Sequence, residues 1–254
     1  MSVACAPPDP ASVVWHDAEC GGYAADLAAW ERLADERGGP ILDLGAGTGR
    51  VALQLAARGH EVVAIDSDRA LLSALRERAA ARAPAVETVR ADIRDLDLGG
   101  RHFPLVIAPM QLVHLLGGAT GRARAFAAIA ACLRPDGAFA LAVLQEPLPP
   151  SGTPEPLPDV REVGGWVHSS LPLAVRVDGA TVELVRLRQL VAPDGALTEE
   201  RVTTVLDRIP APLLEHELEA AGLALCASEP IAATEEHVGS LLVVAEPGIG
   251  GGDG

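Results

Sequence analysis

The chain contains no lysine, a single tyrosine and only 3% aromatic residues. Its 20 basic residues are therefore all arginines, and 35 acidic residues outnumber them, which gives a formal net charge of −15. Nucleic-acid binding needs a basic surface to neutralise phosphates, so this balance argues against DNA, RNA and anionic lipid as partners. No apolar run reaches the roughly 20 residues of a transmembrane helix. We expect neither a nucleic-acid partner nor a membrane partner.

Cysteine is also scarce. The four cysteines form no C-x-x-C pair and have no zinc-like spacing with histidine. We therefore expect free thiols in a reducing compartment and no metal site. Residues 1–10 lack the basic and apolar regions of a secretory signal peptide. These features together predict a cytoplasmic protein.

Hydrophobic residues make up 49% of the 254 residues, enough for a sizeable core. Between residues 40 and 144, short apolar runs alternate with helical stretches, and repeated strand–helix units predict a parallel sheet covered on both faces. We expect strands at 40–44, 61–66, 86–92, 104–108 and 138–144, and helices at 11–38, 50–58, 69–82 and 120–133.

The pattern changes after Pro147, where strands are expected at 166–177, 180–191 and 197–206 without helices between them. Asp-Gly dipeptides at 178–179 and 194–195 are typical of hairpin turns, so this block predicts an antiparallel sheet. A helix at 210–221 and strands at 223–229 and 237–244 complete the pattern.

A glycine-rich loop follows the first predicted strand. Gly45, Gly47 and Gly49 allow the backbone to approach a ligand closely. The helix that begins near Arg50 directs free N–H groups and the positive end of its dipole toward that ligand. A glycine triplet by itself also fits a tight turn with no ligand.

Two aspartates narrow this reading. Asp66 ends the second predicted strand, seventeen residues after Gly49, where an acid accepts both hydroxyls of a ribose. The alternative role for Asp66 is to cap the next helix, but Ser67 or Asp68 can provide that cap instead. Asp43 lies in the first strand, where a buried carboxylate needs a partner such as a cationic ligand group.

These residues fall within a recognisable family pattern. The segment Ile41–Arg50 resembles motif I of the class I S-adenosylmethionine-dependent methyltransferases, of the small-molecule type similar to methyltransferase domain 25. Residues 63–66, 90–93 and 133–138 resemble the family's later motifs, in the same order. The segment 15–23 is similar to the part of small-molecule members that folds over the cofactor, and 160–207 resembles their inserted cap.

The resemblance implies a doubly wound, Rossmann-like α/β fold: a seven-stranded, mostly parallel sheet with an antiparallel β cap inserted before the last helix. It also implies a division of the chain. We expect an N-terminal helical segment at 1–38, the methyltransferase domain at 39–146 and 208–247, the substrate cap at 147–207, and a flexible tail at 248–254.

The resemblance also implies S-adenosylmethionine as cofactor and a small molecule as methyl acceptor. Asp43 is expected to bind the cofactor's ammonium, Asp66 its ribose and Asp92 its adenine amine. The other expected cofactor contacts are the loop residues Gly45, Ala46, Gly47 and Gly49, either Ile65 or Ser67 against the ring, the backbone N–H of Ile93, Met110 at the methionine moiety, and Tyr23 at the carboxylate.

Catalysis is less well defined by the sequence. His114, about one helical turn after the fourth strand, is the candidate general base; the alternative is that it packs under the cap or bonds the backbone. His16 is a second candidate if the N-terminal segment closes the site. The acceptor, the atom methylated and the oligomeric state stay open.

Two other readings remain beside a methyltransferase. A protein that binds the cofactor without catalysis would keep the same motifs. A nicotinamide-dependent oxidoreductase is disfavoured, because Arg50 stands where the dinucleotide fingerprint needs a small residue and because a chain without lysine has no Tyr-x-x-x-Lys pair.

Overall fold

A computed structural model describes residues 11–82, 85–146, 148, 151–152, 157–234 and 238–248 of the chain. The tail predicted at 248–254 lies outside these residues except for Gly248. Among the described helices, none is long and apolar enough to cross a membrane.

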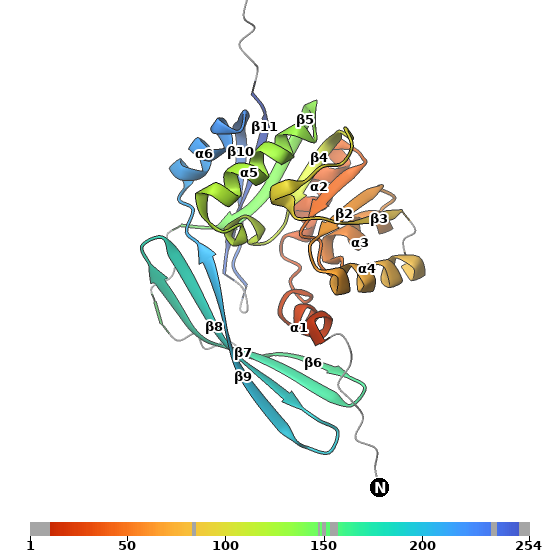
Figure 1. The fold of residues 1–254 in the computed structure, drawn as a ribbon, viewed down its shortest axis with the longest axis vertical. Coiled ribbons are helices and arrows are strands. Elements are labelled where there is room, and N and C mark those ends of the chain that lie inside the picture. The colour runs from red at the N-terminus through yellow and green to blue at the C-terminus, as the bar shows by residue number, and fades with distance from the viewer. Residues whose placement is uncertain are drawn as a thin grey trace, which may run out of the picture.

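The centre of the molecule is a seven-stranded sheet in the order β10-β11-β5-β4-β1-β2-β3 (Figure 1). The strands β5, β4, β1, β2 and β3 pair in parallel, and β11 is antiparallel to both of its neighbours, β5 and the edge strand β10. The strands are β1 (Ile41–Leu44), β2 (Val62–Asp66), β3 (Val86–Arg90), β4 (Phe103–Ala108), β5 (Leu133–Leu144), β10 (Leu223–Ile231) and β11 (Ser240–Pro247). The strands β1 and β4 are buried along their whole length, as expected of a sheet covered on both faces.

Helices cover both faces of this sheet. Leucines and alanines of α2 (Leu27–Arg37), α3 (Arg50–Ala57) and α4 (Arg69–Arg82) form one core cluster with one face. The other face packs against α5 (Gly118–Ala131) and α6 (Ala211–Ala220), together with the short helices η1 (Ile93–Asp95) and η2 (Leu112–Leu115). The predicted doubly wound fold is confirmed.

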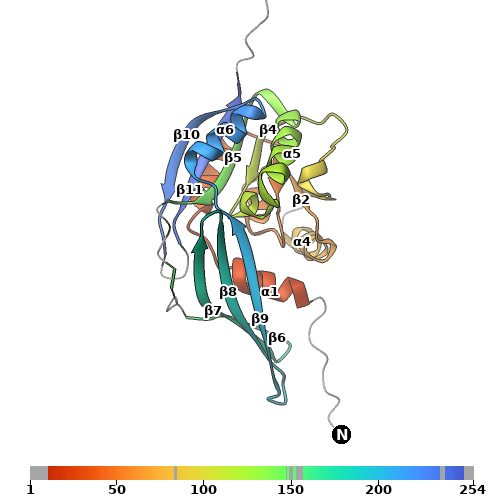
Figure 2. The same cartoon turned by 60° about the vertical axis from the view of Figure 1, so that its left-hand side comes forward.

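A second, antiparallel sheet is inserted between β5 and α6. Its order is β6-β7-β8-β9, with β6 at Asp159–Val163, β7 at Trp166–Asp178, β8 at Thr181–Val191 and β9 at Leu197–Asp207. The sequence pattern missed β6 because this edge strand is short and mostly exposed, so it carries little apolar alternation. Figures 1 and 2 show this sheet extending away from the carboxyl ends of β4 and β5.

The prediction of one helix over residues 11–38 was wrong. The segment forms α1 (Ala11–Cys20) and α2, separated by a turn that begins at Gly21 and Gly22. The break has a long-range cause, because Asp26 just before α2 is fully buried and accepts hydrogen bonds from Trp30 and Arg50. As a result α1 separates from α2 and contacts α4 on one side and β6 and β7 on the other (Figure 2).

Candidate functional site

The glycine loop lies between β1 and α3. Gly45, Gly47 and Gly49 have φ values of 63°, 55° and 95°, in the left-handed region that only glycine adopts readily. The Ala46 N–H donates to the Ile65 carbonyl at 2.9 Å, which holds the loop against the end of β2. The three glycines therefore allow a sharp turn from strand to helix.

These glycines also admit side chains from elsewhere in the chain. A Cβ atom at Gly45 would stand 2.7 Å from Leu112 Cδ1, and one at Gly47 would stand 2.3 Å from His16 Nε2. The close approach that the sequence predicted for a ligand is thus made by two protein side chains as well. His16 covers the middle of the loop and Leu112 covers its beginning.

Asp66 connects this loop to the next helix. Its Oδ2 accepts a hydrogen bond from the Gly47 N–H at 2.8 Å, and its Oδ1 accepts one from the Asp68 N–H at 2.8 Å. Asp68, rather than Asp66, caps α4, since its Oδ1 accepts from the Ala70 N–H at 2.7 Å. The carboxylate of Asp66 keeps acceptor positions on both oxygens for a further ligand.

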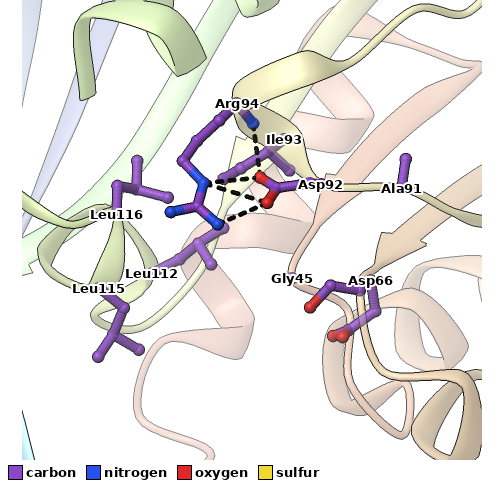
Figure 3. A pocket seen from close by; sticks show the side chains of 10 residues that line it. Gly45, Asp66, Ala91, Asp92, Ile93, Arg94, Leu112, Leu115 and Leu116 are labelled. Carbon is purple, nitrogen blue, oxygen red and sulfur yellow. Dashed lines mark hydrogen bonds and ion pairs between the residues drawn. The ribbon is translucent and has the colours of Figure 1, made fainter. Parts of the chain in front are cut away.

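A cavity of about 230 Å³ opens beside Gly45 and Asp66 (Figure 3). Its lining comes from the carboxyl ends of β1, β2 and β3 and from η1 and η2, the edge at which doubly wound sheets bind ligands. The lining residues are Gly45, Asp66, Ser67, Ala91, Asp92, Ile93, Arg94, Leu112, Leu115 and Leu116.

Asp92 and Arg94 form one wall of this cavity. The Arg94 guanidinium donates to both carboxylate oxygens of Asp92, from Nε to Oδ1 at 2.9 Å and from Nη2 to Oδ2 at 2.5 Å. These bonds lower the pKa of Asp92 to about 2. Asp92 is therefore a fixed hydrogen-bond acceptor at neutral pH.

Asp43 lies behind the glycine loop and is 1% exposed. Within the described residues, neither of its carboxylate oxygens has a hydrogen-bond partner. Burial raises its pKa to about 7, although the nearby Arg50 opposes this shift. A buried acid without a partner is costly, and a cationic ligand group would relieve that cost.

The helix α1 is fixed over the glycine loop by Asp17. The Thr48 hydroxyl donates to Asp17 Oδ1 at 2.7 Å, and Arg78 of α4 donates to both oxygens, at 2.9 and 2.5 Å. Burial raises the pKa of Asp17, but the hydrogen bonds from Arg78 and Thr48 outweigh it and lower the pKa below its usual value. Arg161 of β6 lies 3.4 Å from the same carboxylate, so Asp17 joins the loop to the inserted sheet.

A second contact attaches the segment before α2. Arg50, the first residue of α3, donates two hydrogen bonds to Asp26, at 2.6 and 2.8 Å, and its guanidinium lies over the ring of Tyr23. Tyr23 is itself buried, and this burial raises the pKa of its hydroxyl, which interacts with Ser240 at the start of β11. Arg50 therefore has a structural reason to stand where a dinucleotide site has a small residue.

His114 is 1% exposed and uses both ring nitrogens on the backbone. Its Nδ1 lies 2.6 Å from the Asp207 carbonyl, and its Nε2 accepts from the Leu144 N–H at 3.0 Å. Both nitrogens are therefore occupied, which argues against the predicted role as general base. Leu144 ends β5 and Asp207 ends β9, so His114 joins the two chain crossings that carry the inserted sheet.

Met110 lies between β4 and η2 and is half-buried. It has a φ of 56°, a positive value that no other non-glycine residue of the described ranges shows. Such a conformation costs about 1–3 kcal/mol and concentrates at functional sites. Met110 does not line the cavity, so its predicted contact with the cofactor's methionine moiety stays a prediction.

The structure brings together five of the predicted cofactor residues around one cavity, namely Gly45, Asp66, Ser67, Asp92 and Ile93. Tyr23, Asp43, Ala46, Gly47, Gly49 and Met110 are not among its lining residues. Sequence reasoning missed Ala91, Arg94, Leu112, Leu115 and Leu116. A usable signal existed for Arg94, which lies two positions after Asp92. Among the described residues, no group of three His, Cys, Asp or Glu side chains is arranged to hold a metal.

Comparison with known proteins agrees with this arrangement. A family profile described as a methyltransferase domain matches residues 41–137, the stretch from β1 to the start of β5. The uncharacterized methyltransferase YodH of Bacillus subtilis (strain 168) is 27% identical over 133 residues. That match covers 52% of this chain and 55% of YodH, so it spans little more than half of the curated relative.

Solved structures share the fold over nearly the whole chain. The sugar N-methyltransferase KedS8 from Streptoalloteichus sp ATCC 53650 has a TM-score of 0.72 at 20% identity, covering 97% of both chains. The amino pentose methyltransferase CalS10 from Micromonospora echinaspora, solved with bound S-adenosylmethionine, has a TM-score of 0.70 at 20% identity, covering 96% of this chain and 100% of its own. Residues 41–137, whose motifs surround the cavity, therefore match a methyltransferase domain, and the chain as a whole shares its fold with methyltransferases.

Proposed function

We propose that this protein transfers a methyl group from S-adenosylmethionine to a small-molecule acceptor by in-line displacement. The observation that carries the proposal is the cavity itself, in which the carboxylates of Asp66 and Asp92 flank the start of the glycine loop. Its volume of about 230 Å³ lies below the roughly 300–1,000 Å³ typical of whole-ligand pockets. We therefore infer that it receives the adenosine half of the cofactor.

The residues present fit this cofactor. Asp66 offers acceptor positions to two ribose hydroxyls, and Asp92 offers one to the adenine amine. Asp43 is a buried carboxylate whose oxygens lack partners within the described residues, and it suits an ammonium group. The helix α1, fixed by Asp17, covers the loop on the side where the amino-acid half would lie.

The sulfonium supplies an already activated methyl group, so alignment and exclusion of water account for most of the protein's work. The helix α1 and the inserted sheet exclude water from the loop. His114 is held by two backbone groups, so we assign it no role as a general base. An acceptor that arrives with a free lone pair needs none.

Both the net charge of −15 and the inserted sheet favour a small acceptor over a nucleic acid. KedS8 and CalS10 act on sugars, according to their descriptions. Amino sugars are therefore the first class to include in an acceptor panel. Turnover with any acceptor would separate an enzyme from a protein that binds the cofactor without catalysis.

The test is calorimetry with S-adenosylhomocysteine on the wild-type protein and on Asp66→Ala. Two hydrogen bonds to a charged group contribute about 1.5–3 kcal/mol each, so we expect a loss of affinity of roughly 100-fold or more. Asp97→Ala is the matched control, because this exposed carboxylate accepts a similar turn hydrogen bond from Gly99 at 2.9 Å, away from the cavity. A folded Asp66→Ala protein with unchanged affinity would contradict the proposal.

A further inference from the structure

Arg94 lies on the wall of the cavity, and the proposed function assigns it no part in cofactor binding (Figure 3). Its backbone N–H donates to Asp92 Oδ1 at 2.9 Å, in addition to the guanidinium bonds from Nε and Nη2. Three donors of Arg94 thus hold the carboxylate of Asp92, two positions earlier in the chain. The side chain is 41% exposed, so a ligand in the cavity can reach it.

These bonds leave Asp92 with a defined remaining capacity. A carboxylate has about four acceptor positions; Arg94 donates to Oδ1 from its backbone N–H and Nε and to Oδ2 from Nη2, and Nε is shared with Oδ2 at a longer 3.1 Å. The shared Nε–Oδ2 contact is the longest of these, so an incoming donor can take its place on Oδ2. Because the guanidinium also keeps the carboxylate ionised, Asp92 has no proton to offer. It can receive an amine but repels a carbonyl at the same place.

The start of α5 makes room for this side chain. A Cβ atom at Gly121 would stand 3.6 Å from Arg94 Cδ, and one at Gly117 would stand 3.8 Å from Arg94 Nη1. Nη1 makes no hydrogen bond among the described residues and lies on the guanidinium edge away from Asp92. The arginine is thus supported along its length, with one nitrogen left for a ligand.

We propose that Arg94 determines the nucleobase specificity of this site, by holding the Asp92 carboxylate in the orientation that receives the amine of a 6-amino purine. The inference rests on the proposed function, since it concerns the adenosine half of the same cofactor. Arg94 is a specificity-determining residue here and not a catalytic one.

The test compares two ligands by calorimetry on the full chain. S-adenosylhomocysteine carries the 6-amine, and S-inosylhomocysteine carries a carbonyl there and an N–H at ring position 1. We expect the wild-type protein to prefer the adenosyl ligand by about 100-fold, since a repelled carbonyl and a lost charge-assisted bond amount to about 3 kcal/mol at 1.4 kcal/mol per tenfold change.

Arg94→Met keeps most of the alkyl stem and removes the planar guanidinium with its paired hydrogen bonds to Asp92. We expect its affinity for the adenosyl ligand to fall about 10-fold and its preference over the inosyl ligand to shrink to about 10-fold, because Asp92 is then free to turn away. Arg94→Lys keeps the charge without the plane, and we expect it to behave like Arg94→Met. Arg101→Met is the matched control, since Arg101 bonds Glu87 at 2.9 and 3.0 Å outside the cavity.

The outcomes separate two failures. Wild-type affinity and preference in Arg94→Met would overturn the inference while the proposed function stands. Full restoration of both by Arg94→Lys would also overturn it, because charge alone would then be sufficient. If the wild-type protein binds neither ligand, the proposed function itself fails. Retained circular dichroism and melting temperature in both variants confirm that the fold is intact.

Discussion

Replacing His114 with leucine tests whether this buried histidine connects the two crossings of the inserted sheet. The wild-type ring bonds the Asp207 carbonyl at 2.6 Å and the Leu144 N–H at 3.0 Å. Leucine has similar bulk and no hydrogen-bonding atom, so the variant leaves both backbone groups without their partner. The neutral ring with its proton on Nδ1 satisfies both groups at once.

The expected cost follows from these two bonds. A buried polar group that loses its partner costs about 1–3 kcal/mol. Leu144 and Asp207 are both half-buried, so water can compensate in part and the lower half of this range applies. We therefore expect His114→Leu to lower the free energy of unfolding at pH 7.5 by about 2–4 kcal/mol.

The pH dependence gives a second signature. Burial lowers the pKa of His114 below its ordinary value of 6.5, although the bond to Asp207 opposes the shift. The unfolded chain then binds a proton more readily than the folded one, so the contribution of His114 is complete above pH 6.5. It is lost as the pH falls from 6.5 toward the folded pKa, at up to about 1.4 kcal/mol per pH unit.

The assay is urea denaturation followed by circular dichroism at pH 5, 6 and 7.5. The difference between wild type and His114→Leu should be largest at pH 7.5 and should shrink in acid, because only the wild type carries this titration. His102→Leu, at an exposed histidine before β4, is the matched control. A difference below 1 kcal/mol at pH 7.5, or one that stays constant down to pH 5, would refute the reasoning.

Two further predictions concern the cofactor loop. Gly47→Ala should reduce S-adenosylhomocysteine affinity by at least about 10-fold, because its Cβ would stand 2.3 Å from His16 Nε2 at a φ of 55°. Calorimetry measures this affinity, and an unchanged value would show that His16 moves freely. Asp43→Asn should weaken S-adenosylhomocysteine binding by a similar factor. It should also raise the free energy of unfolding at pH 8 by about 1–4 kcal/mol, because a pKa raised to about 7 makes the ionised wild-type side chain unfavourable in the folded protein above that pH. A variant less stable than wild type at pH 8 would show that the carboxylate has a partner.

The sequence predicted the sheet well because its signals are local. Buried strands give apolar runs, and the glycine loop with Asp66 gives a motif whose parts lie within about 25 residues of each other. Neighbouring parallel strands then place Gly45, Asp66 and Asp92 at one edge, whatever the rest of the chain does. This is why five predicted residues meet at the cavity.

The same reasoning left a choice open where distant residues decide the outcome. The sequence allowed His114 to be a base or to bond the backbone, and its two backbone partners, 30 and 93 positions away, agree with the second alternative. Asp26 ends the turn before α2 through a bond to Arg50, 24 positions away. No periodicity or spacing carries such information.

What the sequence by itself determined is the fold class and the glycine loop that we propose binds the methyl donor, since strand periodicity and glycine conformation are properties of short segments. The tertiary structure alone decided what surrounds that loop. Asp17 became the link between α1, the loop and β6, and His114 became the link between the ends of β5 and β9. Both roles come from burial, because a buried polar group must find a hydrogen-bond partner wherever the chain brings one.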